Sequence, residues 1–234
     1  MAMNLNGKSV LVTGASRGIG KKIFDMMKRK GAYVFGTCTT GESNEFFQVD
    51  FTNKNSCERF YGKIRDMDFD ICINNAGINI VKPFDEFTDE DYETLMSVNV
   101  KAPFKISQIV AKNMRQKGYG RIVNISSIYG VVSREHRLLY TMSKSCLIGM
   151  TKTLSLELAK HGVLVNAVSP GFTKTDLTQK VLGEKGICEV EGKVPMGRLG
   201  TTAEMANAVM FLCGDQNTYI TGQNIVVDGG FLCE

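Results

Sequence analysis

The chain turns at Thr13-Gly14-Ala15-Ser16-Arg17-Gly18-Ile19-Gly20, between an apolar run at residues 9–13 and a stretch of helical period that begins at residue 18. Glycine permits sharp turns and lets a ligand approach the backbone, and the first N–H groups of a helix attract anions. A strand-turn-helix unit of this kind is typical of a dinucleotide phosphate site. A tight turn without a ligand is the alternative. We expect cofactor contacts from Gly14, Ser16, Arg17, Gly18, Ile19 and Gly20.

The same turn does not match the loop of nucleoside triphosphate-binding proteins. The frame G-x-x-x-x-G-K-[ST] that ends at Gly20-Lys21 has Ala15 at its first glycine and Lys22 at the Ser/Thr position. The sequence therefore excludes a kinase or GTPase of the P-loop type.

Short runs rich in Val and Ile alternate with longer helical patterns along the whole chain. The runs predict seven strands at residues 9–13, 33–36, 46–49, 70–73, 121–125, 164–168 and 224–227, and helices at residues 18–30, 54–65, 90–116, 138–161 and 203–213. Such alternation indicates βαβ units and a parallel sheet covered on both faces. We predict an α/β fold with one Rossmann-type, doubly wound, seven-stranded sheet of order 3-2-1-4-5-6-7, formed by residues 1–234 as a single domain.

One predicted crossover is short. Residues 37–45, between the second and third strands, are too few for a full crossover helix. We expect a loop or a single turn there.

Composition excludes several classes of protein. The 234 residues are 43% hydrophobic and 22% charged, which is enough apolar surface for a core, and the net charge of +4 is too small and too dispersed for a nucleic-acid surface. Seven cysteines without a CxxC pair, together with only two histidines, provide no zinc site and indicate reduced thiols in the cytoplasm. No apolar run approaches the ~18 residues of a membrane span.

Two polar side chains are expected on one face of the helix at residues 138–161. Tyr140 and Lys144 are four residues apart, so they lie one turn apart on the same face. A nearby ammonium favours the phenolate, and we expect Lys144 to bring the pKa of Tyr140 toward neutrality. Ser127 follows the predicted strand at residues 121–125, at the edge where open α/β sheets bind ligands.

Each of these residues has an ordinary structural alternative. Tyr140 could be a half-buried aromatic, Ser127 a turn residue, and Asn99 a polar residue that bonds to nearby backbone. A hydrolase triad with one of the histidines does not fit, because Ser127 lacks the G-x-S-x-G turn. Together, the four polar residues favour one shared site over four unrelated structural roles.

Five motifs occur in order with the glycine turn: Asn74-Asn75-Ala76-Gly77, Ser97-Val98-Asn99-Val100, Ser127, Tyr140-x-x-x-Lys144, and Pro170-Gly171-Phe172-Thr173. With them the chain resembles the short-chain dehydrogenase/reductase family over nearly its whole length. Within that family the motif sequences are most similar to those of the 3-oxoacyl-[acyl-carrier-protein] reductases, notably at Gly197-Arg198-Leu199-Gly200.

The resemblance implies roles for individual residues. Tyr140 would be the acid in the reductive direction, Lys144 would also hold the nicotinamide ribose, and Ser127 would bond the substrate carbonyl. Asn99 would anchor a water in a proton relay to Lys144. Further cofactor contacts are implied at Asp50, Phe51, Asn75, Ala76, Gly77, Pro170, Gly171 and Thr173. The resemblance also implies a homotetramer built on residues 90–116, 138–161 and 219–233.

The end of the second predicted strand favours NADPH over NADH. An Asp or Glu usually bonds a free ribose 2′-hydroxyl at this position, and the sequence there is Thr37-Cys38-Thr39-Thr40. Arg17, Thr37 and Thr39 can contact a 2′-phosphate instead. Glu42 is the alternative, since in a short loop it could approach the ribose.

The segment before Tyr140 is unusually charged for the border of a carbonyl pocket. Arg137 could bind an anion, or Arg134, Glu135 and Arg137 could form ion pairs across a subunit contact. Residues 173–196 are expected to form a substrate lid. Its apolar contacts would come from Leu177, Val181, Leu182, Val190, Val194 and Met196, and its freedom from Gly183, Gly186 and Gly192.

The substrate is less well defined by the sequence. We expect reduction of a ketone, either carrier-bound as in 3-oxoacyl reductases or small and polar, for example of carbohydrate type. Gly118 and His161 stand where the resemblance implies arginines for a carrier protein, although Lys117, Arg121 and Lys160 are adjacent. An idle NADP-binding sensor or scaffold is the alternative outside the enzymes, and the four polar residues argue against it.

Overall fold

The computed structural model describes residues 5–233, apart from the side chain of Leu177. Seven strands form one sheet of order β3-β2-β1-β4-β5-β6-β7, and every neighbouring pair is parallel. The strands are β1 (Ser9–Val12), β2 (Tyr33–Cys38), β3 (Phe46–Gln48), β4 (Ile71–Asn74), β5 (Gly120–Ile125), β6 (Val163–Pro170) and β7 (Asn224–Val227). The predicted fold class and strand order are confirmed.

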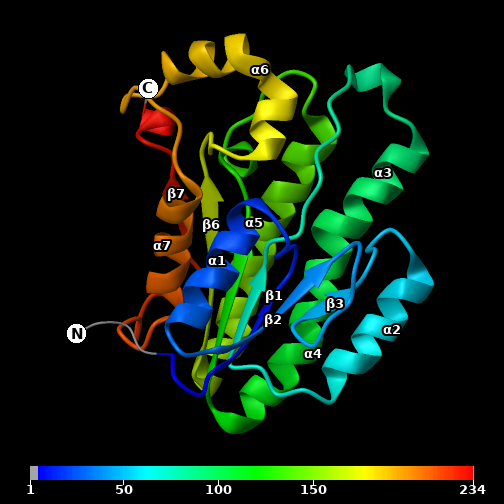
Figure 1. Ribbon diagram of the computed structural model, residues 1–234, viewed down its shortest axis with the longest axis vertical. Helices are drawn as coiled ribbons and strands as arrows, with labels where there is room; N and C mark the ends of the chain where they lie inside the picture. Colours follow the sequence, from blue (N-terminus) through cyan, green and yellow to red (C-terminus); the bar gives the residue numbers. More distant parts are fainter. Residues whose placement is uncertain (1–4, 234) are drawn as a thin grey trace.

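Helices cover both faces of this sheet (Figure 1). Successive strand residues alternate between two cores, as a pleated strand requires: Leu11 packs with α2 (Lys54–Arg65), α4 (Ala102–Lys117) and α5 (Leu138–Leu158). Val10 and Val12 pack with the opposite layer, formed by α1 (Gly18–Arg29) and α7 (Thr202–Cys213). The nearly continuous apolar strands are therefore explained by burial on both sides.

The link between β2 and β3 contains no helix, as expected from its length. It is a loop closed by a bridge between Ser43 and Phe46. In this loop Glu42 forms an ion pair with Lys63 of α2.

The helix predicted at residues 90–116 is interrupted. It consists of α3 (Asp89–Met96), a π-helical turn η2 (Ser97–Lys101) and α4. Pro103 in the first turn of α4 has no N–H, so it cannot make the α-helical bond to the carbonyl of Asn99. The helix therefore widens into a π-helical turn around Asn99. Such turns are frequent at functional sites.

The predicted lid contains a helix that periodicity did not indicate. Helix α6 (Asp176–Glu191) is kinked at Gly183, where φ is 63° and ψ is 179°. It lies across one end of the molecule beside the C-terminal turn η5 (Phe231–Cys233) (Figure 1).

The lid packs on a small apolar cluster of its own. That cluster is formed by Val190, Val194 and Leu199, with Leu182, Phe172, Ile187 and Phe231 against it. Two of the predicted contact residues, Val181 and Met196, are exposed instead and do not belong to this cluster. The side chain of Leu177 lies outside the described part of the chain.

Candidate active site

The glycine turn and the loop after β4 form one unit at the carboxyl ends of β1 and β4. Thr13 Oγ1 accepts hydrogen bonds from the N–H groups of Asn75 and Ala76, at 2.9 and 3.0 Å. Asn75 Nδ2 donates to the carbonyls of Thr13 and Gly14. Thr13 was not among the predicted site residues, although its place before the first glycine could have indicated it.

Glycine is required in this unit by both conformation and space. Gly14 and Gly18 have φ of +64° and +58°. A Cβ on Gly14 would stand 2.9 Å from Ala76 Cα, and one on Gly20 would stand 2.2 Å from the Gly14 carbonyl oxygen. The close approach of the two loops explains the glycine spacing.

The N-terminus of α1 is suited to a phosphate. It has no side-chain cap and no acid in its first turn, so its first N–H groups are available to an anion. Ser16 and Arg17 are exposed beside it, and none of the residues described provides Arg17 with an acid partner. The residues present therefore fit the pyrophosphate of a dinucleotide.

The predicted residues around the adenosine differ in accessibility. Thr37 is buried, and its Oγ1 accepts a hydrogen bond of 2.9 Å from the Gly14 N–H. This bond stabilises the glycine turn from its buried side. Thr39 is exposed. Asp50 accepts from the N–H and hydroxyl of Thr52, and Phe51 packs edge-on against Phe60 in the core.

Tyr140, Lys144 and Ser127 are brought together at the carboxyl edge of the sheet. Lys144 is buried; its Nζ lies 5.6 Å from the centre of the Tyr140 ring and donates to the Ile125 carbonyl at 2.9 Å. Ser127 follows β5, and its Oγ accepts from the Tyr129 N–H at 3.1 Å while bonding to the Tyr140 side chain. The phenol and the hydroxyl can thus reach one carbonyl oxygen.

The pKa values depart from expectation. Loss of solvent raises the pKa of Tyr140, which the Ser127 bond and the charge of Arg137 partly oppose. Burial lowers the pKa of Lys144 to about 8. Lys144 is not among the groups that shift the pKa of Tyr140, so the expected effect of Lys144 on the phenol stays a prediction.

The side chain of Asn99 is fully used in holding two elements together. Its Oδ1 accepts from the Ile78 N–H, and its Nδ2 donates to the Ile78 carbonyl at 2.9 Å and to Ser143 Oγ at 3.0 Å. Ser143 in turn donates to the Tyr140 carbonyl at 2.8 Å. A Cβ on Gly77 would lie 3.4 Å from Lys144 Nζ and 3.5 Å from Asn99 Oδ1, so these groups share one small space.

Two serines missed by sequence reasoning fix α5 at the site. Ser143 links it to Asn99, and Ser126 Oγ donates to the carbonyl of Lys144 at 2.9 Å. In the sequence, only the position of these serines next to Ser127 and Lys144 indicated a role at the site. Serine is too common in turns and helices for that signal to be specific.

The segment after β6 supports the lid. Gly171 N–H donates to the Val227 carbonyl, and a Cβ at Gly171 would meet Asp228 Cα at 2.6 Å. Pro170 is the last residue of β6, and buried Thr173 donates to the Gly171 carbonyl at 3.0 Å. Gly200 forms an isolated parallel bridge with Thr173, so the Gly197–Gly200 motif lies beside the start of the lid.

A cavity of about 200 Å³ lies under the lid. Tyr129 and Phe172 contribute aromatic walls, and Arg134, Glu189 and Lys193 contribute charges. Tyr129 meets the Tyr140 ring edge-on at a centroid distance of 6.4 Å. The cavity is thus one aromatic ring from the phenol.

Among the described residues no group of three or more His, Cys, Asp or Glu side chains could hold a metal ion. Within residues 5–233 no helix has the length and apolar character to cross a membrane.

A phosphate-binding glycine turn and a phenol-hydroxyl-lysine group at one sheet edge define a nicotinamide-dependent oxidoreductase. A family model described as enoyl-(acyl carrier protein) reductase matches residues 14–232. The chain belongs to the short-chain dehydrogenase/reductase family, whose members act with NAD(P) on alcohol and keto groups.

Relatives and solved structures match nearly the whole chain. The 3-oxoacyl-[acyl-carrier-protein] reductase FabG of Rickettsia felis is 40% identical, with 98% of this chain and 99% of that protein covered. The enzyme of the same name from Escherichia coli is 37% identical, with 97% and 98% covered. A solved structure of a putative NAD(P)-dependent gluconate 5-dehydrogenase from Beutenbergia cavernae with bound NADP is 30% identical, has a TM-score of 0.93 and covers 99% of each chain.

Proposed function

We propose that this protein is a single-domain reductase that uses NADPH to convert a ketone into a secondary alcohol, with Tyr140 as the proton donor. The observation that carries the proposal is the meeting of Tyr140 and Ser127 beside buried Lys144, at the same sheet edge as the glycine turn. An idle sensor or scaffold has no physical need of this group.

The chain's own residues supply orientation and a proton. The Ser127 hydroxyl and the Tyr140 phenol would both donate to the substrate carbonyl oxygen, which polarises the carbonyl. Since the pKa of Tyr140 is raised, the phenol retains its proton at neutral pH and can give it to the developing alkoxide. The bound nicotinamide supplies the hydride. Ser127 and the charge of Arg137 then stabilise the phenolate.

Lys144 would hold the nicotinamide ribose. It has no carboxylate partner, and its pKa of about 8 leaves it charged at neutral pH but weakly solvated. Bonds to ribose hydroxyls would replace the water that burial removes. Asn99 would position the loop after β4 and the start of α5 for this purpose.

Preference for NADPH is supported by charge around the adenosine ribose. Arg17 and Thr39 are exposed at the ends of the glycine turn and of β2. The competing carboxylate, Glu42, pairs with Lys63 and is therefore engaged elsewhere. A guanidinium favours a 2′-phosphate over a hydroxyl through a charge-assisted contact.

A 3-oxoacyl thioester is the first substrate candidate, supported by the names of the relatives from Rickettsia felis and Escherichia coli. Docking of an acidic carrier protein has less support. Lys117 is bound to Asp68 and Asp70, and buried Arg121 donates to the carbonyls of Gly120 and Asn217. Of these three adjacent cations, only Lys160 is exposed and has no acid partner within the described part of the chain.

A small polar ketone is the second candidate. The cavity of about 200 Å³ suits a small molecule better than a long acyl chain. The Beutenbergia cavernae structure, named for gluconate, supports this class as well.

We also propose a homotetramer in a reducing compartment, the cytoplasm. Large apolar side chains are exposed on α4, α5 and the C-terminal region, where subunit contacts would bury them: Phe104, Met142, Leu156, Tyr219 and Val226. All seven cysteines are free thiols. Light scattering at micromolar concentration should report four chains, and a monomer would contradict the assembly.

The test of the reaction is NADPH oxidation with three substrates: acetoacetyl-N-acetylcysteamine, the same acyl group on a carrier protein, and 5-ketogluconate. Faster turnover of the carrier-bound form supports the first candidate, and faster turnover of 5-ketogluconate the second. NADPH that binds but is never oxidised by these or other ketones would contradict the proposed reaction and favour the sensor.

A further inference from the structure

Arg137 lies beside the reacting groups but takes no part in the proposed chemistry above except through its charge. It is the residue that precedes α5, three residues before Tyr140, and it is 8% exposed. Its Cζ stands 6.0 Å from the centre of the Tyr129 ring, and that ring stands 6.4 Å from the ring of Tyr140. The guanidinium is therefore separated from the proton donor by one aromatic side chain.

This buried guanidinium has no anionic partner. Nη1 is sealed from solvent and makes no hydrogen bond, and none of the described residues forms an ion pair with Arg137. Burial lowers the pKa of Arg137, the neighbouring tyrosines Tyr129 and Tyr140 partly oppose this, and the charge of Arg134 adds to the lowering. A buried charged donor without a partner is costly, and buried arginines are normally paired. Arg137 thus has an unmet requirement for an anion.

The start of α5 adds to the same requirement. This 21-residue helix has no side-chain cap and no acidic residue in its first turn. Its first N–H groups and its dipole therefore give positive potential at the position that Arg137 occupies. The orphaned guanidinium and the uncapped helix indicate a negative group in the same place.

We propose that Arg137 binds a carboxylate of the substrate, so that the enzyme selects keto acids over neutral ketones. The proposal rests on the proposed ketone reduction and names its substrate class. It favours the second substrate candidate over the thioester.

Geometry argues for a carboxylate on a small substrate. The guanidinium fork matches the two oxygens of a carboxylate. Tyr129, which separates Arg137 from Tyr140, also lines the cavity of about 200 Å³. A carrier-bound thioester also has a negative group, the phosphate of the arm that links it to the carrier protein. That phosphate is many bonds from the thioester carbonyl, so it cannot reach Arg137 while the carbonyl lies at Tyr140.

The subunit-contact alternative fits Arg134 and Glu135 better than Arg137. Those two side chains are exposed, whereas only 8% of Arg137 is accessible to a second copy. An acid from another subunit would have to enter the site itself to pair with it.

The test compares keto acids with their own methyl esters. Pyruvate, acetoacetate and levulinate, each beside its methyl ester, are reduced with NADPH by the wild type and by Arg137→Gln and Arg137→Lys. We expect at least one acid to exceed its ester by about ten-fold or more in kcat/KM. Arg137→Gln should bring that ratio to about one, and Arg137→Lys should keep part of it. Since the ratio is taken within one variant, effects on Tyr140 or on folding cancel.

Lys152→Gln is the control, because it removes a positive charge from an exposed residue of α5 that does not line the cavity. We expect the acid-to-ester ratio to fall less than about three-fold, with the remaining effect screened by salt. An equal loss in both variants would show long-range steering and overturn direct pairing. A wild-type ratio near one for all three pairs would overturn the proposal while ketone reduction stands.

A binding measurement separates this proposal from the proposed function. If no ketone oxidises NADPH, the reaction is wrong, and calorimetry of the same acids and esters against the NADP⁺ complex still tests Arg137. Tighter binding of an acid than of its ester, lost in Arg137→Gln, supports the carboxylate site. Equal binding, or none, overturns it.

Discussion

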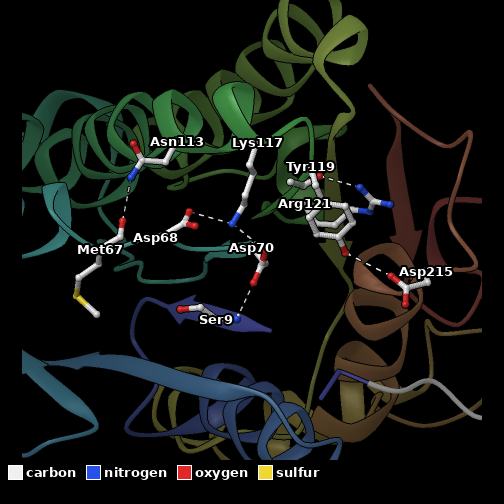
Figure 2. Close-up of polar contacts among 10 residues, drawn as sticks. Ser9, Met67, Asp68, Asp70, Asn113, Lys117, Tyr119, Arg121 and Asp215 are labelled. Atoms are coloured by element: carbon white, nitrogen blue, oxygen red, sulfur yellow. Dashed lines mark hydrogen bonds and ion pairs between the residues drawn. The ribbon is translucent and has the colours of Figure 1, made fainter. Parts of the chain in front are cut away.

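Two lysines at opposite edges of the sheet differ in both burial and electrostatic surroundings: Lys144 is 4% exposed, whereas 26% of the Lys117 side chain is exposed. At the amino edge, Lys117 Nζ lies 2.9 Å from Asp68 and 2.8 Å from Asp70 (Figure 2). Burial alone would lower the pKa of Lys117, but the bonds to Asp70 and Asp68 outweigh it and raise the pKa. At the carboxyl edge, none of the described residues gives Lys144 a carboxylate partner, and burial lowers its pKa to about 8.

The amino edge uses its polar groups to join elements. Asp70 also accepts from the Ser9 N–H at 2.9 Å, Asn113 donates to the Met67 carbonyl, and the Tyr119 hydroxyl bonds to Asp215 (Figure 2). These contacts tie strands to the helices that follow them. The amino edge thus pairs its charges internally, whereas Arg17, Arg137 and Lys144 at the carboxyl edge have no acid partner among residues 5–233.

The largest expected effect is at the carboxyl edge. Tyr140→Phe removes the transferable proton but keeps the ring, so kcat should fall by about 10²–10⁴-fold while NADPH binding stays nearly unchanged. Stopped-flow NADPH oxidation and fluorescence titration measure the two quantities. A kcat within three-fold of the wild type would show that Tyr140 is not the acid.

The second effect tests the unpaired charge of Lys144 through pH. With a folded pKa of about 8 against an ordinary 10.5, the Lys144 side chain binds more protons in the unfolded chain between these values, so Lys144 should contribute a rise in the free energy of unfolding above pH 8, which the raised pKa values of the buried Cys72 and Cys213 thiols oppose. The full rise would be up to about 3 kcal/mol. Below pH 8 both states are protonated and the stabilisation is absent. Above pH 10 the raised pKa of Tyr140 acts in the opposite direction.

Lys144→Met should abolish this rise, as measured by urea denaturation between pH 7 and 10. Lys152→Met, which removes an exposed lysine from the same helix, should preserve it. The buried thiols act equally in both proteins, so the difference between wild type and Lys144→Met isolates Lys144. A difference that stays constant between pH 7 and 10 would mean that Lys144 is compensated by a partner.

The third effect concerns cofactor charge. Arg17→Ala should weaken NADPH relative to NADH by about ten- to a hundred-fold, since a guanidinium-phosphate contact contributes roughly 1.5–3 kcal/mol. The ratio of kcat/KM for the two cofactors is the measurement, and Lys30→Ala at the far end of α1 is the control. A wild type that prefers NADH would refute the proposed preference.

The smallest effect is expected at the amino edge and is purely structural. Lys117→Met leaves two acids without their cation, so the free energy of unfolding should fall by about 1–2 kcal/mol. Its kcat/KM should stay that of the wild type. Lys112→Met, which alters an exposed lysine on the same helix, should change neither quantity. If Lys117→Met lost activity without losing stability, the purely structural role of the amino edge would be contradicted.

Local sequence determined the sheet and much of the candidate site. Apolar runs such as residues 9–13 predict strands because both faces are buried, and the spacing of Tyr140 and Lys144 fixes one helix face regardless of the rest of the fold. The glycine turn is also local, since φ of +64° at Gly14 requires glycine wherever the turn lies.

Only the tertiary structure decided which charges are paired. Lys117 and Lys144 cannot be told apart by residue type, and the acids that bind Lys117 are 49 and 47 residues away along the chain, at the start of β4. The same holds for Arg137, whose burial beside Tyr129 depends on how the loop before α5 folds, and for Asn99, whose partners are Ile78 and Ser143. Periodicity and spacing report on neighbours within a few residues. The electrostatic state of a side chain depends on solvent exclusion and on partners that only the packing of distant segments brings near.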